Sequence, residues 1–255
     1  MLANYHTHTW RCNHASGTEE EYIQEALKRG LAILGFSDHT PYFFPEGYYS
    51  GFRMKMDQLE GYVSTVLALR EKYESRLRIP LGLEVEYYPD LFPRLLPVLK
   101  DQPLDYLILG QHFVGNERGE AYAGRATGDV DVLRRYCRQA MDAMQLGCFS
   151  YLAHPDLICF MGDKKAYAEH MRQLCREAKN CSIPLEMNLH GIVENRHYPN
   201  RIFWEIAAEE GNSVVLGCDA HMPSELSDLS YEKTAMKIVR ELDLEILSIV
   251  PLRSV

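Results

Sequence analysis

The 255-residue chain has an ordinary globular composition, with 46% hydrophobic and 25% charged residues, and its formal net charge is -9. This acidic balance and the lack of any Lys/Arg run argue against a nucleic-acid surface, which normally carries a basic patch. No apolar run approaches the roughly 20 residues of a membrane-spanning helix, so we expect no membrane association. The seven cysteines include no CxxC pair and no secretory leader is recognisable, which predicts a reduced, cytoplasmic protein.

Short apolar runs alternate with helical patterns, beginning with a predicted strand at 3–6. The helix that follows has a defined start and end, because Thr18 and Glu21 form a capping box and Gly30 is typical of a helix stop. Further strands are predicted at 32–37, 79–87, 105–110, 149–153, 183–189 and 213–218, with 244–250 as an eighth candidate. Further helices are predicted near 57–75, 129–146, 164–179, 199–210 and 231–242.

Strands that are apolar almost throughout are typical of a parallel sheet covered by helices on both faces. No break in composition suggests a linker, so we predict a single α/β domain over residues 1–255. The main irregular insertion is the aromatic loop TPYFFPEGYYSGFRMKM at 40–56. A loop of this kind is either functional or a surface cover, and the sequence favours neither.

Histidines crowd the opening stretch NYHTHTWRCNH, which holds three of the 10 in the chain. His6 and His8 close the first strand, and other metal-capable residues follow the later strands. The nine candidates are His6, His8, His14, His39, Glu84, His112, His154, Asp219 and His221. Because the carboxyl ends of parallel barrel strands form one face, where active sites are built, we expect these side chains to share one site.

Imidazole and carboxylate ligands without thiolate suit zinc, iron(II) or manganese(II), and they argue against a closed, cysteine-rich structural zinc site. An open catalytic ion takes three or four protein ligands, so nine candidates are enough for two or three divalent ions. Any one of these histidines alone is more simply explained as a satisfied core residue. The metal prediction therefore depends on their gathering at one rim.

Six motifs in order resemble the polymerase-and-histidinol-phosphatase (PHP) family, and most closely its histidinol-phosphate phosphatase branch: HTHTWRCNHASGTEEE, GFSDHTP, GLEVEYYP, GQHF, AHPD and GCDAHMP. The resemblance spans nearly the whole chain, from His6 to His221. It implies a distorted seven-stranded (β/α) TIM-like barrel, in agreement with the strand count. It also implies metal-dependent hydrolysis of a small phosphomonoester, with L-histidinol phosphate, an intermediate of histidine biosynthesis, as the first choice.

The resemblance implies three ion sites. His6, His8, Glu84 and Asp219 would hold one ion, Glu84, His112 and His154 a second, and His14, His39 and His221 a third. Glu84 and Asp219 are thus the central catalytic carboxylates, and Asp38 is expected to orient a histidine unless it only caps the following turn. Glu86 shares the face of Glu84 and either supports the site or remains a rim carboxylate.

Two departures from the family pattern concern the substrate rather than the metal ligands. Cys159 and Phe160 in HPDLICF stand where a phosphate-binding arginine is common, and Gln111 stands where a small residue is common before His112.

Arg196, in the loop after the sixth strand, is the first candidate for gripping the substrate phosphate. Arg53 and Arg125 also lie in predicted loops, where a solvated surface arginine is the expected state. His190 and His197 flank the Arg196 loop. Either suits protonation of the leaving group, but a loop histidine without a task is the favoured interpretation.

The hypothesis for the chemistry is attack on phosphorus by a hydroxide bridged between two ions. Two alternatives stay open: a phosphodiesterase or exonuclease acting on nucleotides or oligonucleotides, and a phosphatase of broader specificity. A non-catalytic metal-binding domain ranks last, because no predicted ligand is missing. The expected partner is a small phosphorylated substrate, and the sequence does not predict an oligomeric state.

Overall fold

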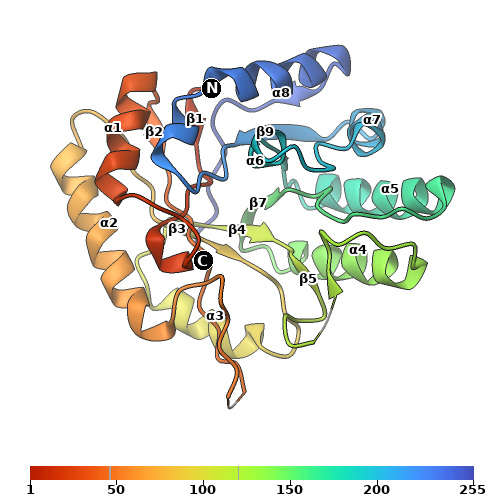
Figure 1. Ribbon diagram of the computed structural model, residues 1–255, viewed down its shortest axis with the longest axis horizontal. Helices are drawn as coiled ribbons and strands as arrows, with labels where there is room; N and C mark the ends of the chain where they lie inside the picture. The colour runs from red at the N-terminus through yellow and green to blue at the C-terminus, as the bar shows by residue number, and fades with distance from the viewer. Residues whose placement is uncertain (46, 120) are drawn as a thin grey trace.

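The computed structural model describes residues 1–45, 47–119 and 121–255. Helices lie around the outside of a central, mostly parallel sheet (Figure 1). Its six strands run in the order β10-β9-β8-β7-β4-β3, and a separate parallel pair is formed by β1 and β2. The strand bounds are β1 Ala3–Asn4, β2 Ile33–Leu34, β3 Gly82–Val85, β4 Tyr106–Gly110, β7 Phe149–Ala153, β8 Leu185–Asn188, β9 Ser213–Gly217 and β10 Glu245–Ile246.

Isolated bridges join the β1–β2 pair to the main sheet. Thr7 pairs with Ala220 beyond β9, and His39 pairs with Glu84 in β3. Within the described residues no continuous sheet closes, because these links are single bridges rather than ladders. The fold is therefore α/β with a mostly parallel sheet, and the seven-stranded barrel stays a prediction. The eighth strand candidate is confirmed, since β10 pairs in parallel with β9.

The predicted helices are confirmed within a few residues: α1 Glu19–Arg29, α2 Leu59–Tyr73, α4 Val130–Met144, α5 Lys164–Asn180, α7 Arg201–Glu209 and α8 Leu229–Glu241. Helix α1 begins as predicted, because Thr18 accepts a hydrogen bond from the Glu21 N–H while the Glu21 carboxylate accepts one from the Thr18 N–H. It ends at Gly30, whose φ of 80° is the left-handed conformation that glycine adopts without strain.

Two α-helices and two strands of the described chain were not predicted. Helix α3 (Phe92–Lys100) contains Pro97 and has a second proline in its first turn, and prolines argue against a helix in a sequence. Helix α6 (His190–Val193) is a single turn, and strands β5 (Phe113–Val114) and β6 (Ala121–Tyr122) form a two-residue ladder. Such short elements leave no periodic pattern to detect.

The sheet is buried on both faces, and alternation along β3 decides what each face presents. Leu83 and Val85 pack into the large cluster beneath the helices. Glu84 points the other way and pairs in register with Ile108, which belongs to an internal cluster with Tyr106 and Tyr151. A carboxylate at this position therefore enters the interior. Among the described residues, no helix is both long and apolar enough to cross a membrane.

Candidate metal centre

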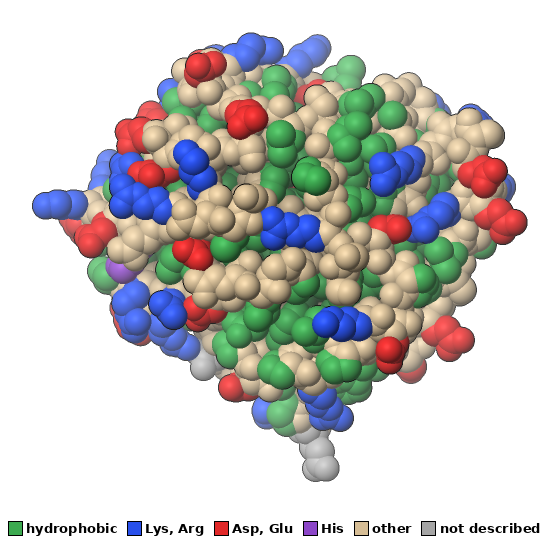
Figure 2. All heavy atoms as spheres, turned by 180° about the vertical axis from the view of Figure 1, so that it is seen from behind, with side chains coloured by type: hydrophobic (Ala, Val, Ile, Leu, Met, Phe, Trp, Pro, Cys, Tyr) green, Lys and Arg blue, Asp and Glu red, His purple; other side chains and the backbone are tan. Residues whose placement is uncertain are grey.

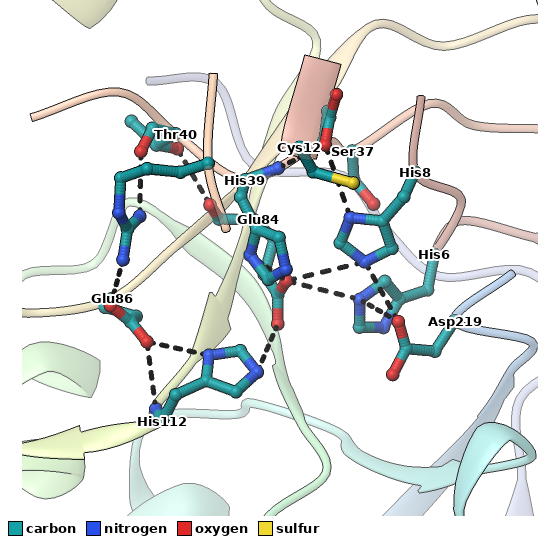
Figure 3. A network of polar contacts seen from close by, with 12 residues as sticks. His6, His8, Cys12, Ser37, His39, Thr40, Glu84, Glu86, His112 and Asp219 are labelled. Atoms are coloured by element: carbon teal, nitrogen blue, oxygen red, sulfur yellow. Dashed lines mark hydrogen bonds and ion pairs between the residues drawn. The ribbon is translucent and has the colours of Figure 1, made fainter. Parts of the chain in front are cut away.

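The ends of successive strands bring the predicted ligands together. His6 and His8 follow β1, Glu84 lies in β3, His154 follows β7 directly, and Asp219 lies two residues beyond β9. Figure 3 shows several of these side chains converging on the Glu84 carboxylate. All nine predicted ligands belong to this one constellation, although His14 is exposed and lies at its outer edge.

The first group lies around Asp219. Its Oδ1 atom is 3.3 Å from His6 Nε2 and 2.9 Å from His8 Nε2. Both of these nitrogens also lie 3.6 Å from Glu84 Oε2. Two imidazoles and two carboxylates thus face one another from three chain segments.

The second group lies around the other oxygen of Glu84. Its Oε1 atom is 2.8 Å from His154 Nε2 and 3.9 Å from His112 Nε2. The two imidazole rings have centroids 4.6 Å apart. Because Glu84 contributes to both groups through different oxygens, its carboxylate has the geometry of a bridge.

The third group comprises His14, His39 and His221, whose ligand nitrogens all lie within 4.8 Å of one another. His14 Nε2 and His221 Nε2 are 2.9 Å apart. His39 connects this group to the bridging carboxylate, since its Nδ1 is 2.9 Å from Glu84 Oε2.

Several atoms in the cluster are buried without any hydrogen-bond partner: His6 Nε2, His8 Nε2, His39 Nδ1, Glu84 Oε2 and His154 Nδ1. Leaving a buried polar atom unpaired costs roughly 1–3 kcal/mol, so such a concentration needs an explanation. Most of these atoms also belong to the groups that could hold an ion. Divalent cations fit this donor set of nitrogens and carboxylate oxygens, and their binding would satisfy the unpaired atoms.

The cluster also controls protonation. Burial disfavours a charged imidazole, yet contacts with Asp219 raise the pKa of His8 to about 9. Burial dominates at His39 and His221 and holds their pKa values well below the usual range. Burial likewise opposes ionisation of Glu84, but the surrounding imidazoles hold its pKa well below normal. Ionised Glu84 and neutral His39 and His221 are in the forms that bind metal ions, whereas His8 must release its proton when an ion binds.

Buried polar residues stand behind the histidines. Glu186, on β8, has its Oε1 atom 2.8 Å from His6 Nδ1. Its Oε2 atom accepts a hydrogen bond from the backbone N–H of His154 at 3.1 Å. Asn188 donates to Glu186 at 2.9 Å and to Asp219 at 3.1 Å. Neither residue was predicted. The signal was present in IPLEMNL, where Glu186 and Asn188 interrupt an otherwise apolar strand.

Asp38 lies behind His8, as the sequence led us to expect. Its Oδ1 is 3.4 Å from His8 Nδ1 and accepts the His39 N–H at 2.8 Å, while its Oδ2 accepts a hydrogen bond from the Thr9 hydroxyl. The contact with His39 is the turn cap that we considered as the alternative. Asp38 therefore makes both kinds of contact.

Two glycines make room for the buried carboxylates. A Cβ atom at Gly110 would overlap the Glu84 side chain, and one at Gly217 would overlap Glu186. Two ligand candidates also have left-handed backbone conformations that are unfavourable for residues other than glycine: φ is 29° at His154 and 51° at Asp219. Such strain is characteristic of sites where a side chain is held in a required position.

A pocket opens over the cluster. Besides metal-ligand candidates, it is lined by Phe52, Phe113, Tyr122, Leu157, His190, Arg196 and Tyr198. Arg196, the predicted contact for the substrate phosphate, is the arginine in this lining. The 40–56 loop contributes Phe52. Residue 46 of that loop lies outside the described residues. The loop therefore takes part in the site.

Other predicted residues have different surroundings. His197 Nε2 lies 2.7 Å from the Leu157 carbonyl oxygen, whereas Phe160 stacks on Tyr167 away from the pocket lining. Arg125 is exposed as expected. The expectation of a solvated Arg53 was wrong: its side chain is buried, because buried carboxylates compensate its charge.

Comparisons with known proteins agree with this geometry. The PHP domain model matches residues 4–190. A probable histidinol-phosphatase of Deinococcus radiodurans is 33% identical over 236 residues, which cover 88% of each chain.

Two solved structures share the fold. A histidinol phosphate phosphatase of Lactococcus lactis, solved with zinc, L-histidinol and phosphate, superimposes with a TM-score of 0.77 at 17% identity, covering 96% of this chain and 95% of its own. A putative histidinol phosphatase of Listeria monocytogenes gives a TM-score of 0.72 at 20% identity, covering 91% of this chain and 99% of its own. The motifs, the gathered ligands and these matches together show that the chain belongs to the PHP domain family.

Proposed function

We propose that this chain is a metal-dependent phosphatase that hydrolyses L-histidinol phosphate to L-histidinol and phosphate. The observation that carries the proposal is Glu84, a buried carboxylate that faces five imidazoles within 3.9 Å. The names of the Deinococcus and Lactococcus relatives support the choice of substrate.

We assign the ligands to three ions. His6, His8, Glu84 and Asp219 hold one, Glu84, His112 and His154 hold a second, and His14, His39 and His221 hold a third. Zinc, iron(II) and manganese(II) are the candidates, because all three accept this donor set. When bound, such ions would supply Lewis acidity to the phosphate oxygens and lower the pKa of a water molecule towards about 7.

The chain itself orients the reactants. Asp38 and Glu186 hold the rings of His8 and His6 from behind, which fixes the nitrogen that each imidazole presents. Arg196 offers a planar fork of N–H donors that matches a phosphate group. The aromatic wall of the pocket excludes water around a small substrate, which strengthens these charged contacts.

The finer structural predictions belong to the same proposal. The single bridges from Thr7 to Ala220 and from His39 to Glu84 support a distorted seven-stranded barrel. We take residues 1–255 as one catalytic domain. The described cysteines are all free, which supports a reducing, cytoplasmic location.

The alternative of a nucleic-acid substrate has less support. A strand-binding surface combines stacking aromatics with a basic groove. The 40–56 loop has the aromatics, but no Lys/Arg run accompanies them in the sequence. On the face seen from behind in Figure 2, Lys and Arg are likewise scattered among Asp and Glu. A phosphatase of broader specificity is a second candidate, because Cys159 occupies the position where the family often has a phosphate-binding arginine.

One panel tests the proposal: protein loaded separately with zinc, manganese and iron, assayed on histidinol phosphate, other phosphomonoesters and single-stranded DNA. We expect the highest kcat/KM on histidinol phosphate and loss of activity in Glu84→Gln. The matched control is Glu74→Gln, which changes an exposed glutamate and should keep parent activity. Preference for DNA, or parent activity in Glu84→Gln, would overturn the proposal.

A further inference from the structure

Arg53 is a charged side chain held in the interior, only 1% exposed. It donates to the Thr40 carbonyl oxygen at 2.8 Å, to Glu86 Oε2 at 2.5 Å and to Glu117 Oε1 at 3.2 Å. Removing a guanidinium from water costs several kcal/mol, which only well-placed acceptors offset. These partners explain how the protein tolerates Arg53, and their locations indicate what it does.

The partners of Arg53 come from separate segments that surround the pocket. Arg53 belongs to the 40–56 loop, Glu86 follows β3, and Glu117 lies between β5 and β6. The loop and the β5–β6 segment also meet at the pocket wall, where Phe52 stacks on Phe113 with centroids 5.6 Å apart. One guanidinium thus connects the loop and the β5–β6 segment to the chain directly after β3, the strand that carries Glu84.

Glu86 extends this network to a metal-ligand candidate. Its Oε1 accepts the His112 N–H at 3.2 Å and lies 2.7 Å from His112 Nδ1. In Figure 3 the His112 ring lies between Glu86 on one side and Glu84 on the other. With Nδ1 directed at Glu86, the other ring nitrogen, Nε2, is directed at the cluster.

We propose that Arg53 is a positioning residue for the metal centre. It fixes the Glu86 carboxylate, which in turn holds the His112 ring with Nε2 facing the ion that we assign to Glu84, His112 and His154. A carboxylate behind a histidine ligand fixes its tautomer and increases its basicity as a ligand. The inference rests on the proposed ligand set. It adds Arg53, a residue of the 40–56 loop that acts on the ligand His112 through Glu86.

A role in folding alone would predict something different. Removing one partner of a buried ion pair leaves an uncompensated buried charge, which destabilises the fold. If Arg53 only filled space, its replacement would change the unfolding temperature and leave ion affinity unchanged. The number of ions retained against a chelator therefore distinguishes the two roles.

The test uses Arg53→Met, Arg53→Lys, Glu86→Gln and the double variant Arg53→Met with Glu86→Gln, each loaded with zinc. The matched control is Arg29→Met, which removes a side chain 2% exposed that pairs with Glu232. Zinc retained per chain is titrated against a competing chelator, and cobalt(II) spectra of substituted protein report the ligand geometry directly. Thermal unfolding verifies that each variant is folded.

We expect Arg53→Met to lose one ion per chain at a 10–100-fold lower chelator concentration than the parent, while its other ions are retained as in the parent. Glu86→Gln should lose the same ion, and the double variant should lose no more, because both residues act through His112. The ion retention of Arg53→Lys should lie between that of Arg53→Met and that of the parent, because lysine keeps the positive charge but lacks the planar guanidinium that bonds two carboxylates at once. Arg29→Met should match the parent.

Ion retention in Arg53→Met equal to that of Arg29→Met would overturn the inference, as would additive losses in the double variant. If Arg53→Met does not fold, Arg53→Lys and Glu86→Gln decide by the same titration and cobalt spectra. Failure of the proposed function is a separate result: the parent itself would hold fewer than two ions or leave histidinol phosphate intact.

Discussion

Gly110→Ala should disable the centre without altering a single ligand. The added Cβ would lie 2.5 Å from the Glu84 carboxyl carbon and 2.7 Å from its Cγ. Ordinary contact begins at 3.4 Å, so the carboxyl carbon must retreat by about 0.9 Å, and Oε1, which lies nearer still, must retreat by more. It cannot do so freely, because His154 and His39 hold its two oxygens at 2.8 and 2.9 Å.

A displacement of about 1 Å in a catalytic group costs on the order of 100-fold in rate. We therefore expect kcat on histidinol phosphate to fall about 100-fold or more, with a loss of bound zinc. The assay combines steady-state kinetics, zinc content and thermal unfolding. The control is Gly61→Ala in α2, where an added Cβ meets nothing within 4 Å. A Gly110→Ala variant that keeps kcat within threefold and its full zinc content would refute the reasoning.

Three further predictions follow from the same geometry. Glu186→Gln weakens the support behind His6, so zinc affinity should fall by about 10–100-fold in a chelator titration, and unchanged affinity would count against it. Arg196→Ala should raise KM for histidinol phosphate by roughly tenfold at unchanged metal content, because a charge-assisted bond to phosphate is worth roughly 1.5–3 kcal/mol; an unchanged KM would remove Arg196 from the site. Burial raises the pKa of Asp156 from 3.8 to about 7. In the unfolded chain the Asp156 carboxyl loses its proton near pH 3.8, whereas in the folded protein it keeps the proton up to about pH 7. The free energy of unfolding of the parent should therefore fall by up to about 1.4 kcal/mol per pH unit as the pH rises through this window. In urea unfolding, the parent should lose stability relative to Asp156→Asn as the pH rises over this range, and the difference should then level off. A stability difference that does not depend on pH would contradict the prediction.

Most candidate ligands could be placed because they lie at or just beyond the end of a strand that the apolar pattern marks. A side chain at the carboxyl end of a parallel strand has little choice of location, so a one-dimensional pattern was enough to place His154 and Asp219 near each other. The grouping into three ion sites came only from the resemblance to the PHP family and stays a prediction. The capped helix α1 was predictable for a similar reason, since Thr18, Glu21 and Gly30 act within a few residues.

The supporting residues depend on contacts that no local pattern encodes. Arg53 and Glu117 are 64 positions apart, and each looks like an ordinary surface residue until the fold buries both. Gly110 is required by the side chain of Glu84 on the neighbouring strand, which only strand order and register reveal. Whether the sheet closes into a barrel is equally hidden from the sequence, because closure depends on how far each ladder extends.

The central claim is that remote acidic and imidazole groups form one multinuclear pocket, and elemental analysis of protein purified without chelators tests it most directly. We predict at least two tightly bound transition-metal ions per chain, with a smaller number in Glu84→Gln. Fewer than two ions in the parent, after growth with zinc, iron and manganese supplied, would contradict the account.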